Sequence, residues 1–98
     1  MPVKEAFSPP KKSAREVTFE YNAPSAKEVS LAGSFNDWKP GASPLIKDRR
    51  GNWKTMLALE PGRYEYLFVV DGDWQCNPQS SECAPNPFGS WNSVVTVQ

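Results

Sequence analysis

Apolar and polar residues alternate with a period of two in several stretches of the chain. Val17, Phe19 and Tyr21, for example, alternate with Thr18 and Glu20. This period predicts β-strands with one buried face. The residues expected to face a common core are Val17, Phe19, Tyr21, Val29, Leu31, Gly33, Phe35, Trp53, Thr55, Leu57, Leu59, Tyr64, Tyr66, Phe68 and Val70.

Turn-forming dipeptides separate these stretches. Pro61-Gly62 is a strong turn signal, and Asp71-Gly72 favours a tight β-hairpin. Trp74 begins a short return strand, and residues 93–97 form a β-branched closing strand. Because no helical periodicity of useful length is present, the pattern predicts an all-β fold, an antiparallel β-sandwich.

This sandwich accounts for residues 16–98 as a single domain. Residues 1–15 carry three prolines, three lysines and one arginine but little that could enter a core, so we expect a flexible N-terminal tail. Its basic cluster, Lys11, Lys12 and Arg15, fits a solvated tail better than a site for a phosphate or an acidic neighbour.

Charge and composition argue against several classes of function. The chain has 11 basic and 11 acidic residues, which argues against binding to nucleic acid or to an acidic membrane surface. It has no histidine, and two cysteines cannot complete a four-ligand zinc site, so no metal or other cofactor is expected. No transmembrane helix or signal peptide is expected. If the chain is complete, this predicts a cytoplasmic location.

Cys76 and Cys83 fall in one polar, proline-rich loop. The simpler interpretation is a pair of free thiols. A disulfide that closes the loop is the alternative, and sequence does not define its geometry.

The four tryptophans differ in their expected environments. Trp53 is in phase with the apolar positions of its strand, so we expect it in the core. Trp38 and Trp74 each follow a turn, where an indole is poorly placed for full burial. Trp91 precedes the closing strand and is ambiguous.

An exposed indole offers a flat apolar surface that a sugar ring can cover. Burying ~100 Å² there contributes roughly 2 kcal/mol at ~25 cal/mol per Å². The sugar hydroxyls then need polar partners, and the polar residues near the indoles in sequence are Asn36, Lys39, Ser90 and Asn92. From the chemistry alone, partial burial at the end of the sandwich and a protein-contact patch remain alternatives.

Several ordered motifs point to a known family. They are residues 31–38 (LAGSFNDW), 51–53 (GNW), 59–74 (LEPGRYEYLFVVDGDW), 77–78 (NP) and 88–95 (FGSWNSVV). Together they resemble family 48 carbohydrate-binding modules over about residues 16–98. The resemblance is to the glycogen-binding modules of AMP-activated protein kinase β subunits and to the early-set domains of isoamylases and branching enzymes.

The resemblance implies an immunoglobulin-like early-set sandwich that binds α-1,4-linked glucans such as glycogen or starch. Two stacking tryptophans of the kinase modules match Trp38 and Trp74. A loop leucine that enters the ring of a curved glucan matches Phe88. A threonine and an asparagine that bond sugar hydroxyls match Ser90 and Asn92.

One position departs from the kinase modules, which have a sugar-binding lysine where this chain has Leu67. Alternation places Leu67 on the outward face of its strand, with Glu65 and Val69. We therefore expect an apolar contact in place of a hydrogen-bond donor, with weaker binding or a different mode of glucan recognition.

Three functions remain in comparison. Non-catalytic α-glucan binding is the prediction, with a polysaccharide or maltooligosaccharide and a glycogen-active enzyme as expected partners. An early-set protein–protein docking domain associated with a glycogen-metabolising enzyme or kinase is the alternative, but docking alone requires neither Trp38 nor Trp74. Glycoside hydrolysis needs two carboxyls across a cleft, whereas Asp37, Asp71 and Asp73 lie at turns, where carboxylates usually cap backbone N–H groups.

Overall fold

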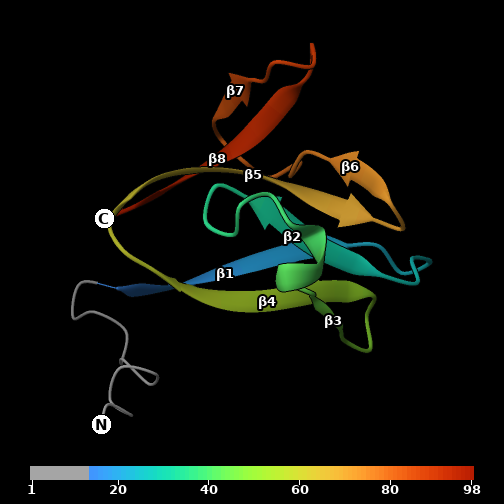
Figure 1. Ribbon diagram of the computed structural model, residues 1–98. Helices are drawn as coiled ribbons and strands as arrows, with labels where there is room; N and C mark the ends of the chain where they lie inside the picture. The colour runs from blue at the N-terminus through green and yellow to red at the C-terminus, as the bar shows by residue number, and fades with distance from the viewer. Residues whose placement is uncertain (1–13) are drawn as a thin grey trace, which may run out of the picture.

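The computed structural model describes residues 14–98, in which eight strands pair into two antiparallel sheets (Figure 1). One sheet has the order β1-β4-β3, formed by β1 (Arg15–Asn22), β4 (Asn52–Leu59) and β3 (Ile46–Lys47). The other has the order β2-β5-β8-β7, with β6 also paired to β5. Its strands are β2 (Val29–Gly33), β5 (Gly62–Val70), β6 (Asp73–Gln75), β7 (Cys83–Pro85) and β8 (Trp91–Val97).

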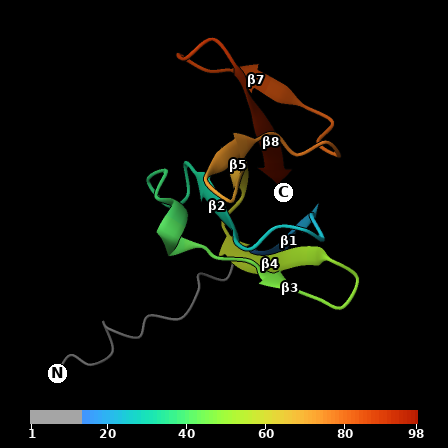
Figure 2. The ribbon, with the colours of Figure 1, turned by 90° about the vertical axis from the view of Figure 1, so that its right-hand side faces the viewer.

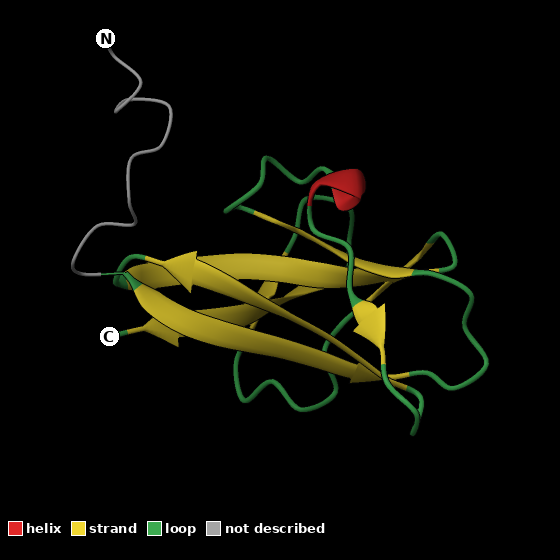
Figure 3. Cartoon of the chain, turned by 90° about the horizontal axis from the view of Figure 1, so that it is seen from below, coloured by secondary structure: helices red, strands yellow, loops and turns green. Residues whose placement is uncertain are grey.

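The predicted sandwich is confirmed, with the two sheets forming two layers (Figure 2). Apart from one 3-10 turn, η1 (Pro40–Ala42), strands and loops make up residues 14–98 (Figure 3). None of the helical structure in this range is long and apolar enough to cross a membrane.

The core lies between the sheets and confirms the predicted alternation. Its buried members are Phe19, Val29, Leu31, Leu45, Trp53, Leu59, Tyr66, Phe68 and Val97. Further predicted residues pack at its margin, namely Val17, Tyr21, Phe35, Leu57, Tyr64 and Val70. Burial of these side chains removes apolar surface from water and is the main stabilising contribution to such a fold.

Aromatic rings in this core pack directly on one another. The Phe19 and Tyr66 ring centroids are 5.1 Å apart, and those of Tyr21 and Phe68 are 4.8 Å apart. The predicted burial of Trp53 is confirmed, and its Nε1–H donates to the carbonyl oxygen of Ala23 at 2.9 Å. A buried indole N–H requires such a partner, so Trp53 is a structural residue.

The structure corrects two boundaries. Arg15, assigned to the tail, begins β1 and pairs with Leu59; the other tail residues of the basic cluster, Lys11 and Lys12, lie outside the described residues. The segment Cys83–Pro85, assigned to a loop, is an edge strand. Proline is tolerated at an edge, and three residues are too few to show a period. Cys76 and Cys83 are both free thiols.

Candidate carbohydrate-binding site

Strand β5 is buried on both of its faces. Tyr66 and Phe68 belong to the core, whereas Leu67 and Val69 point to the outer side of the five-stranded sheet, as predicted. Leu67 is only 9 % exposed and Val69 8 %, so the outward face of β5 is covered as well. A continuous apolar run such as residues 66–70 is typical of a strand that is covered on both faces.

Five small or aliphatic side chains form what we call the outer layer of this sheet. They are buried, lie outside the core cluster and share one face according to the strand register: Ala32, Leu67, Val69, Ala84 and Val94. The layer gives the outer face a rigid apolar base on which the loops can be held.

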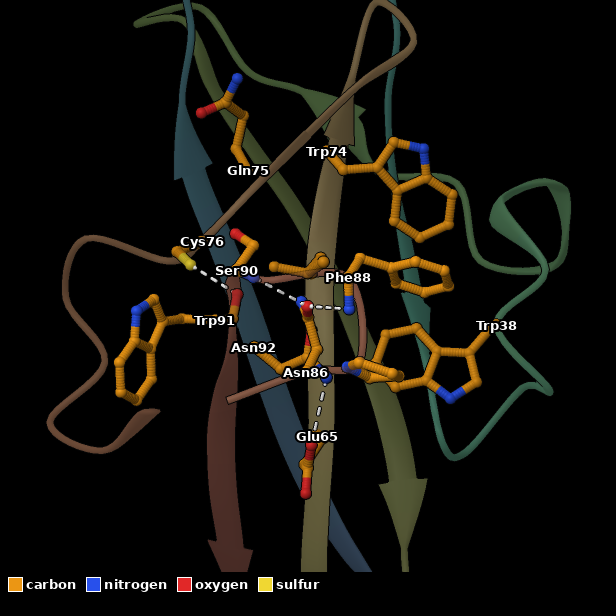
Figure 4. Close-up of a pocket in the computed structure, with 12 residues that line it drawn as sticks. Trp38, Glu65, Trp74, Gln75, Cys76, Asn86, Phe88, Ser90, Trp91 and Asn92 are labelled. Atoms are coloured by element: carbon orange, nitrogen blue, oxygen red, sulfur yellow. Dashed lines mark hydrogen bonds between the residues drawn. The ribbon is translucent and has the colours of Figure 1, made fainter. Parts of the chain in front are cut away.

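A groove of about 980 Å³ lies on this face (Figure 4). It brings together most of the site residues predicted from the sequence: Trp38, Leu67, Trp74, Phe88, Ser90 and Asn92. It does not bring in Asn36 or Lys39, which are absent from its lining. Trp38, Trp74 and Phe88 lie on one side of β5 in Figure 4, and Trp91 lies on the other.

Trp38 is held by a strained turn. Asp37 and Trp38 have φ angles of 57° and 58°, in the left-handed region where a bulky residue is a genuine outlier. The Trp38 N–H donates to the Gly33 carbonyl at 2.9 Å. A Cβ at Gly33 would lie 2.7 Å from the carbonyl oxygen of Glu65, so only glycine fits there. Strain of this kind persists where the surroundings enforce it, and it often marks a functional position.

Asn36 is what enforces this turn. Its Oδ1 accepts from the Gly33 N–H at 3.0 Å, and its Nδ2 donates to the Leu31 carbonyl and to Ser43 Oγ, both at 3.1 Å. The sequence placed Asn36 among the sugar contacts. The structure gives its side chain two backbone partners in β2 and one side-chain partner at Ser43, so Asn36 positions Trp38.

Trp74 is placed by the β5–β6 hairpin. Asp71 and Gly72 have φ angles of 49° and 88°, as expected for this dipeptide, and Asp71 Oδ1 accepts from two backbone N–H groups. The register pairs Trp74 with Val69, so both side chains share the outer face. Trp74 is 47 % exposed and stands over the outer layer.

Phe88 lies at the tip of the β7–β8 loop and is 89 % exposed. Asn86 shapes this loop, because its Oδ1 accepts from the N–H groups of Phe88 and Ser90, both at 3.0 Å. The Asn86 Nδ2 donates to Asn92 Oδ1 at 3.0 Å. The loop is therefore tied to strand β8 through one amide side chain.

The side chain of Asn92 also bonds to Glu65, which is paired with Arg63. Its Nδ2 donates to Glu65 Oε1 at 3.1 Å, and Arg63 Nη1 donates to Glu65 Oε2 at 3.0 Å. The bond from Asn92 and then that from Arg63 hold the pKa of the Glu65 carboxyl below its ordinary value. Within residues 14–98, Glu65 is the one carboxylate that lines the groove.

Several groove residues were not predicted from the sequence as site residues: Glu65, Gln75, Cys76, Asn86, Pro87 and Trp91. The Asn86-Pro87 dipeptide does mark a turn, so the ordering role of Asn86 had a signal. Gln75 had none: the register pairs it with Phe68, on the face opposite to Trp74, and only its tertiary position brings it to the groove lining.

The aromatic rings of the groove differ from those of the core in their contacts. In residues 14–98 every ring pair joins core or margin residues, and none involves Trp38, Trp74, Phe88 or Trp91. The indole N–H groups of these three tryptophans likewise have no hydrogen-bond acceptor within that range, unlike that of Trp53. Flat faces that are fixed but unpaired, in a groove without a pair of carboxylates, define a binding module for a ligand with apolar faces and polar edges.

Comparison with known proteins defines the family. Residues 15–98 match the family described as the glycogen recognition site of AMP-activated protein kinase. The chain belongs to this family, and its predicted class, a carbohydrate-binding β-sandwich for glycogen-type α-glucans, is confirmed.

Individual relatives agree with this assignment. The chain is 34 % identical over 85 residues to 5'-AMP-activated protein kinase subunit beta-1 of Sus scrofa and of Homo sapiens. This covers 87 % of the chain but 66 % and 30 % of those proteins, so the chain spans only part of their length. It is 39 % identical over 72 residues to Protein FLOURY ENDOSPERM 6, chloroplastic, of Oryza sativa subsp. japonica, covering 74 % of the chain and 13 % of that protein.

A solved structure supports the fold. The maltogenic amylase from S. marinus superposes with a TM-score of 0.69 at 26 % identity, covering 85 % of this chain and 13 % of the amylase. The early-set sandwich expected from the resemblance is thus similar to part of an enzyme chain much larger than this domain.

Proposed function

We propose that this chain is a non-catalytic module that binds α-glucan in the groove on the outer face of β5, by stacking glucose rings on Trp74, Phe88 and Trp38. The observation that carries the proposal is the set of three exposed or half-buried rings, each held by its own turn and none packed on another. The apolar C–H face of a glucose ring can cover such a ring surface, and the loss of hydrated apolar area favours binding.

The polar groups at the groove suit sugar hydroxyls. Ser90 Oγ and the Gln75 amide make no hydrogen bond within residues 14–98, and Asn92 has a second amide hydrogen beyond the one given to Glu65. Few such groups surround the rings, and ordering a flexible glucan opposes binding. We therefore expect a Kd on the order of 10 μM to 1 mM, or about 4–7 kcal/mol.

A second role, docking of a partner protein, is favoured by a separate surface. Ile46 and Met56 are 74 % and 61 % exposed and lie on the outer face of the three-stranded sheet. The kinase-subunit names of the relatives suggest a kinase complex or a glycogen-active enzyme as that partner. The cytoplasmic location expected from the sequence stays a prediction.

Affinity electrophoresis tests the main proposal. Migration should be retarded in gels that contain glycogen or amylose and unaffected by cellulose, because rings on separate loops suit a curved chain better than a flat one. A Trp38→Ala, Trp74→Ala double variant should migrate without retardation in all gels. Equal retardation of the unmodified chain by cellulose would contradict the proposal.

A further inference from the structure

Trp91 is the groove aromatic to which the family resemblance assigns no role. It is 54 % exposed and lines the groove on the far side of β5 from Trp74 and Phe88 (Figure 4). We propose that Trp91 is an additional stacking platform, used by a linear α-glucan that has already crossed the groove. This inference rests on the proposed function and extends the site by a further glucose-binding position.

The position of Trp91 is fixed by its backbone. It pairs with Pro85 in the β7–β8 ladder, and its carbonyl oxygen accepts from Cys76 Sγ at 3.0 Å. Successive side chains of a strand point to opposite faces, so Trp91 turns away from the face that carries Asn92. The Trp91 side chain therefore leaves β8 on the side opposite to Asn92, and its exposed ring lies at the sheet edge formed by β7 and β8, across β5 from Phe88 in Figure 4.

The surroundings of Trp91 favour a neutral polyhydroxyl ligand over a protein surface. The Ser90 hydroxyl lies between Trp91 and Phe88 in Figure 4 and has no partner within residues 14–98. The one charged side chain of the lining, Glu65, is already bonded to Asn92 and Arg63. A partner protein held by charge would find no free ion there, whereas a sugar hydroxyl would find the free Ser90 hydroxyl, which can both donate and accept a hydrogen bond.

Trp74 and Trp91 both line the groove, but the rings lie on opposite sides of β5. A compact cyclic oligosaccharide can occupy the Trp74–Phe88–Trp38 side alone. A long linear chain can continue past Ser90 and cover Trp91 as well. The inference therefore predicts that Trp91 matters for extended α-glucans and not for compact ones.

Calorimetric titration of the chain with a long linear maltodextrin and with cyclomaltoheptaose tests this. Trp91→Ala should weaken maltodextrin binding about tenfold, or about 1.4 kcal/mol, and change cyclomaltoheptaose binding less than about twofold. Trp91→Phe keeps a flat ring and should recover most of the loss. Met56→Ala removes an exposed apolar side chain from the other sheet and should change neither affinity.

The cyclic ligand also reports whether the variant folds and keeps the rest of the groove. Unchanged maltodextrin binding by Trp91→Ala would overturn the inference and leave the proposed function standing. Equal weakening for both ligands would also overturn it, because Trp91 would then act only by supporting the loop. If the unmodified chain binds neither ligand, the proposed function itself is wrong and the inference falls with it.

Discussion

Aromatic side chains lie on both sides of β5, but their environments are opposite. On the inner face, Tyr66 and Phe68 pack edge to face at 5.8 Å and contact further rings of the other sheet. On the outer side, Trp74 and Phe88 line the groove with Leu67 and make no ring contact within residues 14–98. Rings that pack on one another stabilise the fold, whereas rings that are held in place without a packing partner are available to a ligand.

The same contrast separates Trp53 from Trp74. Trp53 is 7 % exposed and its N–H has a carbonyl acceptor, whereas Trp74 is 47 % exposed. Substitutions at these two positions should therefore have effects of different kinds, one on folding and one on binding.

Trp53→Ala should produce the largest change. Removing a buried indole loses its transfer free energy and leaves a cavity, so we expect the free energy of unfolding to fall by about 3–5 kcal/mol. Urea denaturation followed by circular dichroism measures this. A loss below about 1 kcal/mol would place Trp53 outside the core and remove the contrast between the two faces.

Trp74→Ala should leave the free energy of unfolding nearly unchanged but weaken glycogen binding at least tenfold, which is about 1.4 kcal/mol or more. The reason is that a stacked indole supplies much of the apolar contact while contributing little to the core. Titration with a maltooligosaccharide beside thermal unfolding checks both parts. Binding at unmodified strength would place the site elsewhere, and Met56→Ala serves as the exposed apolar control.

The core could be read from the sequence because alternation acts locally. Phe19 and Leu31 occupy the predicted face because a strand places every second residue on the same side. Alternation does not show whether an outward face is covered, so the burial of Leu67 could not be predicted. Its cover depends on how segments distant in sequence close over β5, which is a tertiary property.

The site was readable in part for a related reason. Trp74 and Phe88 follow turn signals and match family motifs, so their place in the groove could be expected. Asn36 and Asn92 are polar residues close to indoles in sequence, and sequence cannot show that their amides already have partners within the protein. Counting those partners changes Asn36 from an expected sugar contact to a residue that positions Trp38.

Leu67→Lys tests a residue that is buried in the fold and also lines the binding groove. The outward orientation alone predicts little change in melting temperature, but burial to 9 % exposure predicts a loss of about 1–2 kcal/mol of stability, because apolar contacts are lost and an ammonium is partly desolvated. Leu67 lines the groove, so the lysine stem can extend until the charge reaches water.

At that position the ammonium can donate to a sugar hydroxyl. One such bond contributes about 1–2 kcal/mol, so α-glucan binding should tighten roughly five- to thirty-fold despite the lower stability. Leu67→Met conserves volume and should cost less than about 1.5 kcal/mol with no gain in affinity. Weaker binding by the lysine variant would mean that Leu67 itself contacts the sugar.

The smallest expected effect is a pH dependence that passes through Glu65. Its folded pKa lies below the ordinary 4.5 because Asn92 and Arg63 bond the carboxylate, so the unfolded chain takes up this proton at higher pH than the folded chain does. The stabilisation is therefore complete above about pH 4.5 and is lost as the pH falls through the lower folded value.

Glu65→Gln keeps an oxygen for Asn92 but removes the titrating charge, so its free energy of unfolding should fall less between about pH 6 and 3 than that of the unmodified chain, by under about 1 kcal/mol as for other solvent-accessible pairs. Asp48 also has a lowered pKa, owing to bonds from the backbone N–H groups of Asn52 and Arg50. Asp48→Asn should therefore reduce the acid sensitivity of stability as well.

Only Glu65 is connected to the β7–β8 loop, through Asn92 and Asn86. Acid should thus weaken maltooligosaccharide binding by the unmodified chain and by Asp48→Asn, and weaken it less in Glu65→Gln, in titrations at each pH. The same acid dependence of binding in all three proteins would show that the groove is independent of this charge.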